Sequence, residues 1–198
     1  MYSVGLTSGI GCGKTLISNV FKTFGVPIFN SDQQAKELYK EKEFLEQVIH
    51  IFSTSIIENG EFSPKKLADI VFNDSQALET LNQLIHPKVL DKYKKWQSQQ
   101  NSPYTILESA IIFETSWQNH FDKIINIETP IEIAIERVKL RDKISQEQVL
   151  QRINNQLNPE TKKQLSDYNI YHDNKTMLLS QIIAIHEDIL EQIKNNAQ

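Results

Sequence analysis

The stretch Leu6–Thr15, "LTSGIGCGKT", overlaps the end of an apolar run, "YSVGLT" (2–7), and leads into a segment of helical periodicity. It matches the phosphate-binding pattern G-x-x-x-x-G-K-[ST] at every defined position except the first, where Ser8 replaces glycine. Glycines in such a loop let backbone N–H groups approach phosphate oxygens, and the following helix adds the positive end of its dipole. The stretch therefore predicts a buried strand, a phosphate-binding loop and a helix in succession.

Two side chains at the end of this loop have predicted roles in nucleotide binding. Lys14 is expected to reach the β- and γ-phosphates, and the Thr15 hydroxyl to ligate Mg²⁺. The Ser8 hydroxyl can join the hydrogen bonding of the loop, although a positive φ at this position would cost about 1–2 kcal/mol. The expected nucleotide contacts are Gly9, Ile10, Gly11, Cys12, Gly13, Lys14, Thr15 and Leu16.

Other interpretations of the glycine-rich stretch fit less well. A dinucleotide-binding turn needs G-x-G-x-x-G, whereas the glycines here alternate and Lys-Thr follows the third at once. A merely flexible turn does not explain a Lys-Thr pair at the start of a helix. The chain also lacks the N-K-x-D motif by which GTP-binding switches read their base. Cys12 is expected to fill a small-residue position, with redox sensing as the less favoured alternative.

Length and composition limit the class of protein. A chain of 198 residues has room for one α/β domain with small inserted subdomains. Its formal net charge of −4 argues against a general nucleic-acid binder, and no apolar run approaches membrane-spanning length. Cys12 is the single cysteine, and no basic leader precedes the first strand. We therefore expect a cytoplasmic protein that binds neither nucleic acid nor a membrane; its oligomeric state is left open.

Apolar, β-branched runs alternate with amphipathic segments along the chain, which favours a parallel sheet with crossover helices. The helix after the loop is expected to end at Gly25, and a last amphipathic helix to span 176–193. Besides the first strand, the expected strands are 26–29, 104–109, 123–128 and 168–172.

Capping signals predict two helices between the last two strands. Thr129 is placed as N-cap, with Pro130 at the first helical position and Glu132 completing a capping box, for a helix that runs to about Arg141. A second helix is expected over about 145–158, since the residue before a proline rarely stays helical.

The region 31–100 is expected to be mostly polar and helical, with a turn at 59–64 and with His86-Pro87 at a helix end. Asp32 follows the second expected strand at its carboxyl end, where ligands collect in parallel sheets. It is equally suited, like the two residues before it, to cap the next helix. Spacing alone does not decide between a catalytic and a capping role for Asp32.

Several longer segments follow the loop in a characteristic order: "VPIFNSDQQAKELY", "LNQLIHP", "ESAIIFE", "FDKIINIETPIEIAIERVKLRD" and "QLSDYNI". In this order they resemble the dephospho-coenzyme A kinase family over most of the chain. The resemblance implies an α/β P-loop kinase fold similar to nucleoside monophosphate kinases, with a five-stranded parallel sheet, a helical insertion that binds coenzyme A and a helical lid. It places the core in 1–32, 103–135 and 166–198, the acceptor region in 33–102 and the lid in 136–165.

The activity that this resemblance implies is transfer of the ATP γ-phosphate, with Mg²⁺, to the ribose 3′-hydroxyl of dephospho-CoA in the last step of coenzyme A biosynthesis. Asp32 would bind and deprotonate the acceptor hydroxyl, and Arg141 would contact the transferring phosphate together with Lys14. Glu108 would hold Mg²⁺ through water and lie close to substrate, and His86 would pack or hydrogen-bond near the acceptor. ATP and dephospho-CoA are the implied partners.

Alternatives remain for the residues and for the activity. Arg137 and Arg141 are spaced i, i+4 and could equally be a solvated helix face paired with Asp142 and Glu136; the resemblance favours function for Arg141 and leaves Arg137 undecided. A kinase of the same fold with another small-molecule or nucleoside monophosphate acceptor is the second interpretation. A nucleotide-binding module without transfer activity is the third, less favoured because Asp32 and Arg141 are both present.

The sequence departs from the usual residues of the family at several positions. Asn30 replaces the first of two aspartates but leaves Asp32 intact. Tyr171-His172 replaces an Asp-Asn type pair near the expected adenine pocket. The other departures are Ser8, Pro64 and Ala110.

Overall fold

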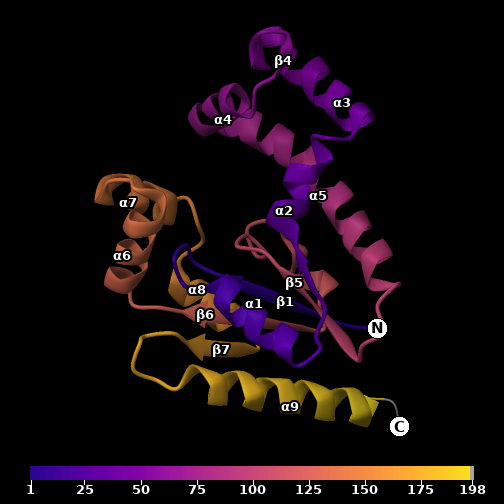
Figure 1. The fold of residues 1–198 in the computed structure, drawn as a ribbon, viewed down its shortest axis with the longest axis vertical. Helices are drawn as coiled ribbons and strands as arrows, with labels where there is room; N and C mark the ends of the chain where they lie inside the picture. The colour runs from indigo at the N-terminus through magenta and orange to yellow at the C-terminus, as the bar shows by residue number, and fades with distance from the viewer. Residues whose placement is uncertain (197–198) are drawn as a thin grey trace. The chain divides into compact units, whose positions relative to one another are not determined.

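Five parallel strands form the central sheet of the computed structural model, which describes residues 1–196 except for the side chain of Phe72. Their order is β2-β5-β1-β6-β7, so β1 lies in the centre (Figure 1). Every neighbouring pair is parallel, which confirms the predicted α/β class. The strands are β1 (Tyr2–Ser8), β2 (Ile28–Asn30), β5 (Tyr104–Glu108), β6 (Lys123–Glu128) and β7 (Tyr168–Tyr171).

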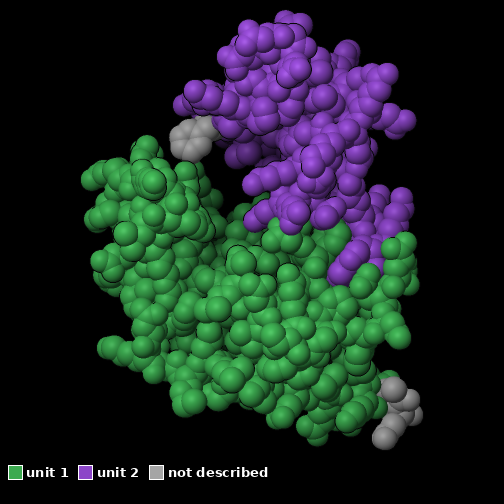
Figure 2. All heavy atoms as spheres, viewed as in Figure 1, with its two compact units in different colours: residues 1–30, 97–198 green, residues 31–96 purple. Residues whose placement is uncertain are grey.

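The chain divides into two compact units, which Figure 2 colours separately. The first unit, Met1–Asn30 with Gln97–Gln198, contains the whole sheet, and the second is Ser31–Trp96. Across the described part of the chain, no helix combines the length and apolar character needed to cross a membrane.

The core of the first unit lies between the sheet and two helices, α1 (Lys14–Thr23) and α9 (Leu178–Asn196). Because side chains alternate along a strand, Ile127 and Ile170 face these helices, whereas Asn126 and Asn169 face the other side. On that side, the Asn169 amide donates to a carbonyl oxygen of helix α8 (Pro159–Leu165) at 3.2 Å. The sheet is therefore covered on both faces, as expected for parallel strands.

Helix ends in the first unit confirm two predicted helix boundaries, the end near Gly25 and the start near Ser145. Gly25 has φ +77° and its N–H donates to the Lys22 carbonyl at 3.0 Å, which ends α1. Ser145 forms a full capping box with Gln148 at the start of α7 (Gln146–Asn154).

Two other predictions about helix ends were wrong. Helix α6 (Ile131–Asp142) begins after Pro130 without a side-chain cap, because the Thr129 hydroxyl donates instead to carbonyl oxygens outside the helix. Helix α7 ends at Asn154 rather than near Asn158-Pro159, since Asn158 caps the next helix and Pro159 is its first residue.

The second unit is helical, as predicted, with one small hairpin. The hairpin turns at Asn59-Gly60, with φ values of +52° and +83°, as a type I′ turn requires. Its elements are α2 (Ser31–Leu38), α3 (Lys42–Phe52), a 3₁₀ turn η1 (Ser53–Ile56), β3 (Ile57–Glu58), β4 (Glu61–Phe62), α4 (Pro64–Asn73) and α5 (Ser75–Gln97).

The predicted helix end at His86-Pro87 is a further error, because Pro87 lies inside α5. Proline removes one helical hydrogen bond and usually ends or kinks a helix. Here side chains on both sides of the proline, Leu81 before it and Val89 after it, are buried, which favours a continuous helix. Tertiary packing therefore overrides the local preference.

Candidate active site

The glycine-rich loop connects the carboxyl end of β1 to the first residue of α1. Gly11 and Gly13 have φ values of +79° and +94°, which favour glycine strongly. At Gly11 a Cβ atom would also lie 2.5 Å from the carbonyl oxygen of Ala134 in α6. Gly11 and Gly13 thus allow the left-handed backbone conformations of the loop, and Gly11 also allows α6 to pack closely against it.

Replacing Gly11 with alanine is expected to lower the free energy of unfolding. Left-handed strain alone would cost about 1–2 kcal/mol, and the loss should clearly exceed this because the new methyl would overlap a backbone carbonyl. Gly25→Ala is the matched control: its φ is +77°, but apart from the two neighbouring residues in the chain no heavy atom of the described residues lies within 4 Å of the added Cβ. Urea unfolding of both variants measures the difference, and equal losses would show that the contact with α6 is not close.

The hydroxyl of Ser8 takes part in the hydrogen bonding of the loop, as predicted. It donates to the Gly9 carbonyl at 2.8 Å and accepts from Nζ of Lys14 at 3.3 Å. Ser8 is the last residue of β1, so it keeps an extended backbone and avoids the left-handed strain that a serine could have suffered. Lys14 is thereby held over the first residues of the loop.

Glu108 ends β5, the strand beside β1, and pairs in register with Leu6. Its side chain is buried, and Oε2 accepts a hydrogen bond of 2.8 Å from the hydroxyl of Ser18 in α1. The carboxylate therefore lies at the carboxyl edge of the sheet, beside the helix that begins at Lys14. That edge is where ligands collect in parallel α/β sheets.

The carbonyl oxygen of Cys12 connects the loop to two other segments. It accepts from the Thr129 hydroxyl at 3.3 Å and lies 2.9 Å from Nδ1 of His172. Thr129 follows β6 and His172 follows β7, so both contacts come from the carboxyl edge of the sheet. Neither role could be predicted from the sequence, because the contacts join positions more than 100 residues apart.

The two arginines of α6 have different partners. Arg137 places Nη1 and Nη2 each 3.1 Å from a ring nitrogen of His172, and Nη2 donates to Asn174 at 2.6 Å. Arg141 is largely exposed and forms a bidentate pair with Asp142, at 2.7 and 3.1 Å. The hydrogen bonds from Arg141 hold the pKa of Asp142 below its usual range. This pairing is the one that the solvated-face alternative predicted.

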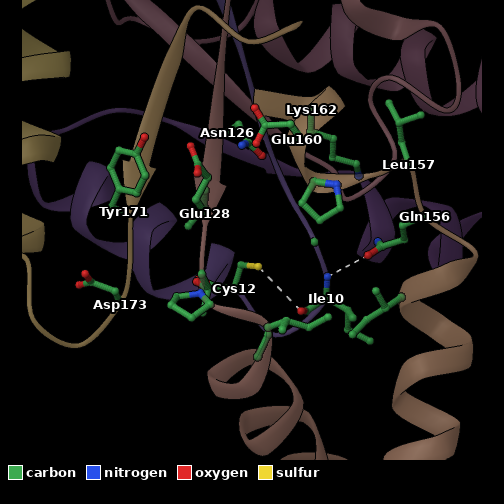
Figure 3. A pocket seen from close by; sticks show the side chains of 18 residues that line it. Ile10, Cys12, Asn126, Glu128, Gln156, Leu157, Glu160, Lys162, Tyr171 and Asp173 are labelled. Atoms are coloured by element: carbon green, nitrogen blue, oxygen red, sulfur yellow. Dashed lines mark hydrogen bonds between the residues drawn. The ribbon is translucent and has the colours of Figure 1, made fainter. Parts of the chain in front are cut away.

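A cavity of about 370 Å³ borders the loop on the side of β6 and α8 (Figure 3). Gln156 closes one side, where its Oε1 accepts the Ile10 N–H at 2.9 Å, and the walls are mostly apolar. Cys12 also lines the cavity, and burial raises the pKa of its thiol. Gly13, Lys14 and the residues that follow them in α1 do not line it.

The polar lining of this cavity is acidic. Glu128, Glu160 and Asp173 contribute carboxylates, and backbone N–H donors from Thr176 and Lys175 lower the pKa of Asp173 to about 2. The one lining cation, Lys162, is buried, pairs with Glu114 at 2.8 Å and donates to the Ala110 carbonyl at 2.7 Å. The negative charge of this lining therefore disfavours the binding of a triphosphate in the cavity.

Comparison with known proteins identifies the family. The family profile described as dephospho-CoA kinase (CoaE) matches residues 2–178. This chain belongs to the dephospho-CoA kinase family. A dephospho-CoA kinase of Porphyromonas gingivalis is 30% identical over 191 residues, which cover 96% of this chain and 95% of that protein. One of Bartonella quintana is 31% identical over 196 residues, which cover 96% and 100%.

Solved structures agree with this membership of the dephospho-CoA kinase family. A dephospho-CoA kinase from Campylobacter jejuni superposes with a TM-score of 0.66 at 26% identity, covering 98% of each chain. The protein TT1252 of Thermus thermophilus gives a TM-score of 0.84 at 25% identity, covering 96% of this chain and 97% of that one. A shikimate kinase from Bacteroides thetaiotaomicron, at 12% identity and a TM-score of 0.50, shares the fold alone.

Within this member of the dephospho-CoA kinase family, the predicted site residues fall into both units. The loop and Glu108 belong to the first unit. Asp32 is exposed in the first turn of α2, and His86 is half-buried in the middle of α5, where burial lowers its pKa; both belong to the second unit.

Proposed function

We propose that this chain transfers the γ-phosphate of ATP to the ribose 3′-hydroxyl of dephospho-CoA, the last step of coenzyme A biosynthesis. The observation that carries the proposal is the phosphate-binding loop between β1 and α1, in a chain that the family profile matches over residues 2–178. The single cysteine is compatible with a reducing cytoplasm, where we place the protein.

The triphosphate would bind on the side of the loop that faces the start of α1. The backbone of this side runs through Gly11 and Gly13, whose positive φ values let successive N–H groups turn toward one anion. The cavity on the other side is lined by three carboxylates, of which Glu128 pairs with Lys163 at 3.2 Å, and the remaining two would oppose the binding of phosphate. Gly9 through Leu16 thus remain the proposed nucleotide contacts.

Lys14 would give the largest single contribution to the reaction. Phosphoryl transfer passes through a loose, charge-dispersed transition state, so the protein acts mainly by positioning and by charge neutralisation. Without nucleotide the ammonium group donates to the Ser8 hydroxyl at 3.3 Å, a long contact with a neutral acceptor, whereas a phosphate oxygen would form a charge-assisted hydrogen bond with it. Arg141 would leave its exposed pair with Asp142 to contact the same phosphate, as the lid segment 136–165 closes.

Asp32 would orient and deprotonate the acceptor hydroxyl. It lies two residues after the end of β2 and immediately before the region 33–102, which we assign to the acceptor. His86 would contribute to the same acceptor region from α5. The remaining segments, 1–32, 103–135 and 166–198, would form the core that holds the nucleotide.

Mg²⁺ fits this site only as an ion shared with the nucleotide. Among the described residues, no group of three or more His, Cys, Asp or Glu side chains is placed to hold a metal. Mg²⁺ prefers one or two protein ligands together with phosphates and water. The Thr15 hydroxyl and, through water, the buried Glu108 carboxylate would complete such a set. Bound Mg²⁺ would neutralise part of the charge on the β- and γ-phosphates.

The purified protein is expected to consume dephospho-CoA in a reaction that needs both ATP and Mg²⁺. A coupled assay for ADP, run in parallel with dephospho-CoA, AMP and CMP as acceptors, measures this. Turnover of AMP or CMP with none of dephospho-CoA would replace the proposal by the second kinase interpretation. Omission of Mg²⁺ from the same assay is expected to remove activity.

A further inference from the structure

His172 contacts the loop at the peptide that joins Cys12 to Gly13. Its Nδ1 lies 2.9 Å from the Cys12 carbonyl oxygen, and a Cβ at Gly13 would lie only 2.6 Å from the same nitrogen. The backbone of His172 is fixed as well, since its N–H donates to the Glu128 carbonyl at 2.8 Å and its carbonyl accepts from Thr129 at 3.2 Å. The imidazole is therefore held against the loop by its own main chain.

One tautomer satisfies these contacts. A carbonyl oxygen only accepts, so Nδ1 must carry the proton that it donates to Cys12. The other nitrogen, Nε2, is then an acceptor, and Arg137 Nη2 is its donor at 3.1 Å. Arg137 Nη1 lies 3.1 Å from Nδ1 but cannot donate to it, because Nδ1 already carries a proton. This contact is therefore a van der Waals contact between the guanidinium group and the imidazole ring.

The direction of the Cys12 carbonyl sets the direction of the Gly13 N–H. A peptide group is planar and trans, so its C=O and its N–H point to opposite sides of the chain. With the carbonyl held outward by His172 and Thr129, the Gly13 N–H points away from them, into the loop. Gly13 itself, with φ +94° and no side chain, has little intrinsic preference that would hold this peptide in place.

We infer that His172 is a positioning residue of the nucleotide site, which orients the Cys12–Gly13 peptide for phosphate by donating from Nδ1 to the Cys12 carbonyl. The inference rests on the proposed function, because it takes the loop to bind the triphosphate. His172 acts through the peptide and not on the reacting atoms. The residue is one of the departures from the usual family pattern, where an Asp-Asn type pair would offer an amide donor instead.

The test compares His172→Leu, which has no donor, with His172→Asn, whose amide N–H can replace Nδ1–H. His172→Leu is expected to raise the KM and the Kd for ATP about tenfold, since one hydrogen bond to the loop is lost, while kcat and the KM for dephospho-CoA change less than about twofold. His172→Asn is expected to stay within about threefold of the wild type in all four constants.

His186→Leu is the matched control for the loss of a histidine hydrogen bond. His186 Nδ1 lies 2.7 Å from the hydroxyl of Tyr104, the first residue of β5, and its ring stacks on Phe24. This contact is at the amino end of the sheet, away from the loop. His186→Leu is expected to lower the Tm and to leave the KM for ATP unchanged, which separates a positioning role from a structural one.

Three results would overturn the inference. The first is wild-type ATP binding in His172→Leu, and the second is an equal loss of ATP binding in His172→Asn. The third is a fall of Tm or of kcat in His172→Leu with an unchanged KM for ATP. Imidazole ¹⁵N shifts of the wild type give a further test that needs no variant, since a proton on Nε2 instead of Nδ1 would also contradict the proposal. ATP binding is measured by calorimetry without any acceptor. A wild type that binds ATP but does not phosphorylate dephospho-CoA would refute the proposed function and leave the His172 test intact.

Discussion

Replacing Lys14 with alanine is expected to lower kcat/KM by about 10²–10³-fold. The ammonium group is proposed to neutralise charge on the β- and γ-phosphates throughout the transfer, and removing a single preorganised donor costs about 10²–10³ in other enzymes. Alanine is a good helix former, so α1 should still begin at position 14. The folded state loses a hydrogen bond of 3.3 Å to Ser8, which is worth about 1 kcal/mol or less.

Lys22→Ala is the control for this prediction. Lys22 is exposed in the last turn of the same helix, so its removal takes away the same charge at the opposite end of α1. Steady-state rates with ATP and dephospho-CoA should then be close to those of the wild type. If Lys14→Ala kept a tenth or more of the activity while remaining folded, the loop would not be gripping the transferred phosphate in the way proposed.

Features that depend on neighbouring residues could be predicted from the sequence. The strand at 123–128 has the predicted bounds, because a short apolar run is bounded by charged residues and then by Thr-Pro. The helix start near 145 is also where it was predicted, because the capping partners Ser145 and Gln148 are three residues apart and need no third segment. The loop itself belongs to this class, since its glycines, lysine and threonine are contiguous.

Features that depend on distant segments could not be predicted in this way. Thr129 has the residue type of an N-cap, but its hydroxyl is used by the Cys12 and His172 carbonyls, which lie 117 and 43 residues away along the chain. The contact of His172 with Cys12 joins positions 160 residues apart. Pro87 does not end its helix either, and Leu81 and Val89 on its two sides are both buried, which a local rule does not take into account.

Asp32→Asn is expected to lower kcat by about 10²–10⁴-fold while the KM for ATP stays within about twofold, since a general base contributes to the chemical step and not to nucleotide binding. The change is nearly isosteric, and the side chain is exposed in the first turn of α2. Its cost to the free energy of unfolding is therefore at most that of the interaction with the helix dipole, about 0.3–1 kcal/mol.

Glu37→Gln is the control, because it makes the same carboxylate-to-amide change on the same helix, where Glu37 pairs with Lys40 at the surface. Pre-steady-state measurement of the first turnover separates the chemical step from product release. A wild-type rate in Asp32→Asn would leave Asp32 as a first-turn carboxylate that interacts only with the dipole of α2, and would require another group to orient the acceptor hydroxyl. Because the transition state is loose, a loss below tenfold would assign Asp32 to orientation and not to proton removal.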